Sequence, residues 1–243
     1  MKNTGVNKHV KSLNVSKRTI GLAALTLLVG LGSVGLEAHG VTGKDAVFLQ
    51  GLEGQALGPL MYLGAKHMVT GYDHLLFLVG VIFFLYRLKD VLLYVSLFTL
   101  GHSLTLLGGV LGGIYANPYL IDAVIGFSVV YKAFENMDGF RRFFGVQPNT
   151  RAAVLIFGLF HGFGLATKLQ EFALSQNGLV ANIVSFNVGV EIGQVLALTG
   201  VLIAISYWRR HPGFLRHSFA TNTALMTGGF LLMGYQLTGY FLQ

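Results

Sequence analysis

The sequence predicts an all-α membrane protein, a polytopic membrane helix bundle of six transmembrane helices after an N-terminal signal peptide or signal anchor. Of its 243 residues, 53% are hydrophobic and only 11% are charged, whereas charged residues make up about 25% of a soluble protein. The apolar residues gather in runs that reach the roughly 20 residues a helix needs to cross a bilayer. Short charged linkers separate these runs. The lipid bilayer is therefore the expected partner of most of the chain, and no room remains for a separate soluble domain.

The N-terminal segment has the three parts of a secretory signal peptide. Cations come first, an apolar run occupies 20–36, and the small residue Ala38 closes it. We expect 1–38 to be a signal peptide, or a signal anchor if it is not cleaved, and 39–243 to be the six-helix transmembrane domain. The cations before the apolar run are Lys2, Lys8, Lys11, Lys17 and Arg18.

Six further apolar segments follow, at about 60–86, 91–113, 118–137, 152–170, 180–207 and 220–242. The linkers after the first, third and fifth segments are basic, whereas the alternate linkers hold almost no cations. Because basic loops stay in the cytoplasm, the pattern predicts a protein of the bacterial inner (cytoplasmic) membrane whose mature N-terminus and C-terminus both lie outside. The basic residues are Arg87 and Lys89, then Arg141, Arg142 and Arg151, then Arg209, Arg210 and Arg216.

The formal net charge is +7, but the cations follow the topology and form no binding stripe. No basic patch with interleaved aromatic residues occurs, so we expect no nucleic-acid partner. No phosphate-binding loop occurs either, so the chain is not expected to hydrolyse ATP. Cysteine is absent from the sequence, which excludes disulfides and thiolate metal ligands.

Glycines spaced four residues apart occur inside three of the apolar segments. This small-xxx-small spacing allows helices to pack at backbone contact. We therefore expect the second, fourth and fifth helices to approach their neighbours closely. The pairs are Gly108 and Gly112, Gly158 and Gly162, and Gly189 and Gly193.

Ionisable side chains inside the predicted spans are the candidates for function, because a bilayer makes them costly. Four of the predicted helices contain such residues. If the topology holds, all of these residues except His67 lie near the middle of the bilayer. The candidate metal ligands are His67, Asp73, His74, His102, His161 and Glu191. The residues expected to orient them are Ser103, Asn187 and Gln194. A cluster of imidazoles and carboxylates without sulfur suits a divalent transition metal such as Ni, Co or Zn.

His67 is the exception in depth. It precedes His74 by seven residues, so an unbroken helix would place it about two turns closer to the outside. It then resembles a ligand on the way to the site, unless a break at Gly71 changes its position. Glu135 and Asn136, near the cytoplasmic end of the third helix, allow two readings: a salt-bridged rim or an exit site.

In these motifs the sequence resembles the HupE/UreJ family of hydrogenase- and urease-accessory membrane proteins. The resemblance covers about 64–194 and rests on His67…Gly71-Tyr72-Asp73-His74-Leu75-Leu76-Phe77-Leu78, Thr99-Leu100-Gly101-His102-Ser103-Leu104-Thr105, Glu135-Asn136, Phe157-Gly158-Leu159-Phe160-His161-Gly162-Phe163-Gly164 and Phe186-Asn187-Val188-Gly189-Val190-Glu191-Ile192-Gly193-Gln194. It implies a nickel or cobalt permease with a cleaved signal peptide and metal ligands in the first helix, and it names metalloenzyme-maturation proteins as candidate partners.

Two departures indicate the second, less characterised branch of that family. Met68 stands where nickel permeases of the family have proline, and Phe163-Gly164-Leu165 stands where they have a further histidine and a glutamate. Three functions stay open at this point. The favoured one is a permease for a divalent transition-metal cation. The alternatives are an intramembrane zinc-dependent hydrolase and a non-catalytic membrane accessory subunit. A transporter rather than an enzyme is the expectation.

Overall fold

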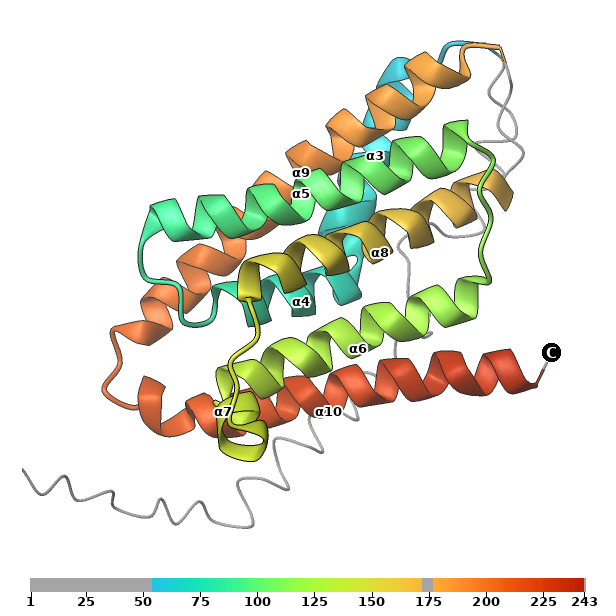
Figure 1. The fold of residues 1–243 in the computed structure, drawn as a ribbon. Coiled ribbons are helices and arrows are strands. Elements are labelled where there is room, and N and C mark those ends of the chain that lie inside the picture. The colour runs from blue at the N-terminus through green and yellow to red at the C-terminus, as the bar shows by residue number, and fades with distance from the viewer. Residues whose placement is uncertain (1–53, 172–176, 243) are drawn as a thin grey trace, which may run out of the picture.

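The computed structural model describes residues 54–171 and 177–242, which are entirely helical apart from their linkers (Figure 1). The all-α prediction is confirmed for this part of the chain. The predicted signal peptide, 1–38, lies outside it. The helices are α3 (Leu57–Thr70), α4 (Tyr72–Ile82), α5 (Leu88–Leu111), α6 (Pro118–Asn136), α7 (Gly139–Phe144), α8 (Thr150–Glu171), α9 (Leu179–Arg209) and α10 (Phe214–Phe241).

The first predicted span is divided into two helices. α3 ends and α4 begins at Gly71, whose backbone is extended at φ −71° and ψ 98°. A side chain does not fit there, because a Cβ would lie 2.9 Å from the carbonyl oxygen of His67 and 3.0 Å from Oδ1 of Asp73. Asp73 and His74, in the first turn of α4, are buried, so the N-terminus of α4 lies in the interior of the bundle (Figure 1).

Arg209, the last residue of α9, holds the opposite end of α4. Its guanidinium donates hydrogen bonds to the carbonyl oxygens of Leu85 at 2.8 Å and Phe83 at 2.7 Å, and also to that of Ile82. These carbonyls belong to the last turn of α4 and the residues just after it, where a helix leaves its acceptors unsatisfied. The guanidinium also lies over the ring of Tyr86, 4.5 Å from its centroid.

Three of the described helices are long and apolar enough to cross a membrane, judged by length and composition: α5, α8 and α9. The break at Gly71 leaves α3 and α4 with only 14 and 11 residues. α6 carries Asp122, Lys132 and Glu135 within its 19 residues. The structure thus contains three candidate spans in its described part, where the sequence predicted six spans.

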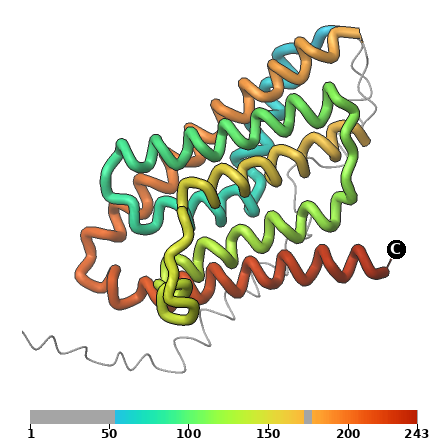
Figure 2. Tube along the Cα trace, viewed as in Figure 1, coloured from blue at the N-terminus to red at the C-terminus, as the bar shows by residue number. Residues whose placement is uncertain are grey.

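The helices pack mainly as pairs: α3 with α9, α5 with α8, and α6 with α10 (Figure 2). Glycines bring each pair to backbone contact. A Cβ at Gly193 would lie 2.5 Å from the carbonyl oxygen of Ala65, one at Gly158 would lie 2.5 Å from that of Phe98, and one at Gly126 would lie 2.7 Å from the amide nitrogen of Met233.

The predicted glycine pairs on α8 and α9 are confirmed, because Gly162 and Gly189 also contact the backbone of the neighbouring helix. The prediction for Gly108 is wrong, because no atom of a neighbouring described helix lies within 4 Å of the Cβ it would carry. On that helix Gly101 makes the contact instead: its Cβ would lie 2.5 Å from the carbonyl oxygen of Leu155. Spacing alone does not say which side of a helix faces a neighbour.

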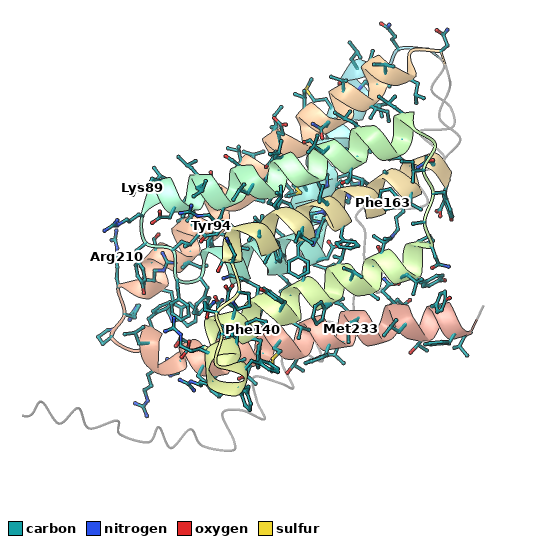
Figure 3. All side chains as sticks on the ribbon, viewed as in Figure 1. Lys89, Tyr94, Phe140, Phe163, Arg210 and Met233 are labelled. Atoms are coloured by element: carbon teal, nitrogen blue, oxygen red, sulfur yellow. The ribbon has the colours of Figure 1, made fainter. Side chains whose placement is uncertain are left out.

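The basic linkers share one end of the bundle. The segments 83–87, 137–149 and 210–213 lie at the left in Figure 1, whereas the linker 112–117 and the end of α10 lie at the right. Figure 3 places Lys89 and Arg210 together at that left end. The alternation of basic and non-basic linkers in the sequence therefore corresponds to the two ends of one helical bundle.

Gly189→Ala tests the backbone contact between α3 and α9. A Cβ there would overlap the carbonyl oxygen of Met61, so we expect a loss of about 1–3 kcal/mol, as for other overpacked interiors. The measurement is the thermal unfolding midpoint in detergent. Gly200→Ala is the matched control on α9, since no atom of a neighbouring described helix would lie within 4 Å of its Cβ. Equal midpoints for the two variants would contradict the contact.

Candidate functional site

Three histidine rings from three other helices gather around His74 on α4. The ring centroid of His74 lies 4.8 Å from that of His161 on α8, 4.9 Å from that of His67 on α3, and 5.9 Å from that of His102 on α5. All four side chains are buried. The sequence placed His74, His102 and His161 at one depth, and the structure brings these three together.

His67 is also part of this group, and its expected position two turns away is wrong. In an unbroken helix, seven residues would separate it from His74 by about 10 Å along the axis. The extended backbone at Gly71 redirects the chain, so that the two rings meet edge to face at an interplanar angle of 78°. The break that the sequence left open as an alternative is what adds His67 to the cluster.

Asp73 orients the central imidazole. Its Oδ1 accepts a hydrogen bond from the backbone N–H of His74 at 2.8 Å and lies 2.9 Å from Nδ1 of the His74 ring. An ionised carboxylate can only accept, so Nδ1 carries the proton and Nε2 keeps a lone pair. Carboxylates hold metal-binding histidines in this way. Asp73 also lies in the first turn of α4, where the helix dipole favours a negative charge.

Ser128 on α6 orients His161, a role that the sequence reasoning missed. Its hydroxyl donates to the carbonyl oxygen of Ile125 at 2.6 Å and lies 3.2 Å from Nε2 of His161. Because a hydroxyl has a single proton, His161 donates from Nε2 and keeps its lone pair on Nδ1. The available signal was a lone buried hydroxyl in the otherwise apolar middle of α6.

Phenylalanine rings surround the cluster. Phe98 lies 5.1 Å from His161 and 6.1 Å from His102 between ring centroids, and Phe77 lies 5.3 Å from His161. Both phenylalanine side chains are almost completely buried. In such an apolar shell the electrostatic interactions of the histidines and of Asp73 are stronger than they would be in water.

Glu191 does not join the buried group. It is exposed on α9, and its Oε1 lies 3.5 Å from Nδ2 of Asn187 on the same helix. The reason is rotational: Gly189 and Gly193 face α3, and a residue two positions away lies about 200° around the helix. The predicted place of Glu191 beside the histidines is therefore not observed.

The other expected orienting residues have different contacts. Gln194 donates to Oγ1 of Thr99 at 2.7 Å and so links α9 to α5. Asn187 is buried and faces Glu191. Ser103 is half-buried, and its hydroxyl has no hydrogen-bond partner among the described residues. Asp73 and Ser128 make the contacts to histidine ring nitrogens that were expected of these three residues.

The rings do not form a preassembled metal cage. Within 54–171 and 177–242, no three His, Asp or Glu side chains are arranged so that they could hold one metal ion. The imidazoles pack edge to face, with angles of 67° to 79° between His74 and each of its three neighbours. Imidazole rings from four helices and one carboxylate thus lie close together without being arranged to hold one ion.

The tautomers of His74 and His161 can be measured by ¹⁵N NMR of protein labelled on its eight histidines. We expect His74 as the Nδ1–H tautomer and His161 as the Nε2–H tautomer, because Asp73 and Ser128 fix them. Asp73→Asn should remove the preference at His74 alone, and Ser128→Ala that at His161 alone. The same tautomer mixture in both variants and the unmodified protein would refute these assignments.

The comparisons with known proteins give one match. The family described as HupE / UreJ protein matches residues 43–243, a range that includes the four clustered histidines and Asp73. No curated protein and no solved structure matches the chain significantly.

Proposed function

The chain belongs to the HupE / UreJ protein family, and from this premise we propose that it is a membrane permease for a divalent transition-metal cation of the nickel or cobalt type. The family implies a membrane accessory protein concerned with nickel or cobalt. The observation that carries the step to transport is the buried cluster of His67, His74, His102 and His161 beside Asp73, in a bundle of apolar helices.

The chemistry of the cluster supports this proposal. Imidazole nitrogens bind nickel, cobalt and zinc, and a carboxylate offsets part of the charge of a divalent cation. Histidine and aspartate are rare in membrane helices unless they serve a substrate pathway or pair with one another. Here the Asp73–His74 pair presents the remaining lone pair of His74 away from the carboxylate.

The break between α3 and α4 supports transport as well. Secondary transporters place their substrate sites at discontinuous helices in the interior of the bundle. The Gly71 break lies between His67 and His74, directly at the cluster. A cluster that is not already arranged to hold an ion suits a cargo that is bound and released.

The topology proposed with this function has the basic linkers in the cytoplasm and both ends of the mature chain outside the inner membrane. The shared end of the linkers at 83–87, 137–149 and 210–213 supports it, because positive loops remain on the cytoplasmic side. The proposal also includes six spans and removal of residues 1–38 as a signal peptide.

Replacement of His74, His102 or His161 by alanine should each abolish uptake of ⁶³Ni²⁺ or ⁵⁷Co²⁺ by cells that express the protein. Asp73→Asn should lower the affinity about 10- to 100-fold, as loss of an orienting carboxylate does. The exposed His211→Ala is the control, and immunoblots give equal protein levels. Normal uptake by His74→Ala would remove the permease and leave the accessory-subunit reading.

A reporter enzyme that is active only outside the cytoplasm should be active when fused after Gln243. The same enzyme fused within the linker 137–149 should be inactive, since that linker carries Arg141 and Arg142. The reverse pattern would show that the proposed orientation is wrong. Equal activity at both points would contradict an odd number of crossings between them.

A further inference from the structure

A polar stripe on α6 leads away from the histidine cluster. Ser128, Lys132 and Glu135 are all buried, and their spacing of four and then three residues places them on one face of the helix. Ser128 contacts His161. Lys132 and Glu135 follow about 6 Å and 10 Å further along the helix axis, toward the linker 137–149. We refer to this end of the bundle as the Arg141 end.

Glu135 is the centre of a closed set of contacts at the Arg141 end. Nζ of Lys132 lies 2.6 Å from its Oε2. Nε2 of Gln147 donates to its Oε1 at 3.0 Å, and the hydroxyl of Thr150 donates to the same oxygen. One carboxylate thus ties α6 to the linker and to the first residue of α8, and one lysine neutralises it.

Lys132 lies against the half-helix that carries the central histidine. A Cβ added to Gly80 of α4 would be 3.1 Å from Cγ of Lys132. One turn further on, Nδ2 of Asn136 donates to the carbonyl oxygen of Gly80 at 2.9 Å and to Oδ1 of Asn222 on α10 at 2.9 Å. The ion pair is therefore placed where α4, α6, α8 and α10 meet, between the cluster and the Arg141 end.

Stability is a weak reason for such a pair. Removing two charges from water costs about as much as their attraction returns, and apolar residues of similar volume often do as well. Apolar residues could not act on the charge of a cation that passes by, whereas the ion pair can. An ammonium group repels a divalent cation, whereas a bare carboxylate attracts one.

From this placement, and resting on the function proposed above, we propose that Lys132 and Glu135 form the gate at the Arg141 end, with Glu135 as a second cation site. In the closed state, the ammonium group of Lys132 pairs with the carboxylate of Glu135 in place of a metal cation. When Lys132 moves away, Glu135 accepts the cation that leaves the histidines. The hydroxyl oxygen of Thr150 and the amide oxygen of Gln147 are further oxygen ligands within reach.

A second ion pair at the other end of α6 provides a matched control. Nζ of Lys168 on α8 lies 3.1 Å from Oδ2 of Asp122, six residues before Ser128. Each pair can be broken by replacing its lysine, which is Lys132 on α6 in one pair and Lys168 on α8 in the other. Only the loss of Lys132 should open the path from the Arg141 end.

The chain has no cysteine, so a single Ser128→Cys substitution reports access to the cluster. Membrane vesicles or proteoliposomes are treated with a membrane-impermeant maleimide from the Arg141 side. Adding Lys132→Ala should speed labelling roughly tenfold, which corresponds to about 1.4 kcal/mol lost from the closed state. Lys132→Arg should keep labelling slow, and Lys168→Met should leave it unchanged from this side. The exposed Val146→Cys in the linker 137–149 checks that every background is folded and equally oriented.

Uptake of ⁶³Ni²⁺ and ⁵⁷Co²⁺ into proteoliposomes of the protein that keeps Ser128 separates this proposal from the permease itself, because Ser128 contacts His161. Equal labelling of Ser128→Cys with and without Lys132, when the protein that keeps Ser128 takes up either metal, would overturn the gate. Faster labelling without Lys132, when the protein that keeps Ser128 takes up neither metal, would overturn the permease and retain a gate for another solute. Glu135→Gln should slow metal release and leave metal binding at the cluster intact. Fast release by that variant would refute the second cation site.

Discussion

The extended backbone at Gly71 is the constraint on which the candidate site depends. It turns one apolar span into two short helices and brings His67 next to His74. It also creates a helix N-terminus within an apolar interior, where the first amide groups lack acceptors from their own helix. Asp73 accepts from the amide of His74. The residue that satisfies the new helix end is thus the same one that orients the central imidazole.

The remaining helices form a closely packed frame around this break. Glycines at the interfaces allow backbone contact within the pairs α3–α9, α5–α8 and α6–α10. The α5–α8 contact matters most for the site, because Gly162 meets the carbonyl oxygen of His102 and directly follows His161. The close approach of these two backbones therefore helps to place the rings of His102 and His161 at 5.9 Å and 4.8 Å from that of His74, measured between centroids.

Much of this arrangement could be predicted from the sequence. The helices expected at 91–113, 118–137, 152–170 and 180–207 begin and end within about three residues of α5, α6, α8 and α9, because apolar runs and charged linkers determine the ends of membrane helices. The grouping of His74, His102 and His161 could be predicted too, since equal depth on neighbouring helices follows from chain length.

Rotation and local breaks could not be predicted in the same way. Depth gave Glu191 a place beside the histidines, but the angle set by Gly189 and Gly193 turns it outward. The spacing of His67 assumed a continuous helix, which the backbone at Gly71 interrupts. Ser128 was missed because an isolated hydroxyl in an apolar helix commonly bonds to its own backbone, and only its distance to His161 distinguishes it.

The contacts of Arg209 have a consequence for how α4 responds to charge. This 11-residue helix has a carboxylate at its positive end and a guanidinium at its negative end, so both poles of its dipole are neutralised. In the function proposed above, a cation bound near Asp73 would compete for the first of these interactions and leave the second unchanged. Only the charge interaction at the C-terminal end of α4 would then be unchanged. The energy of its N-terminal turn would depend on whether the site holds a cation.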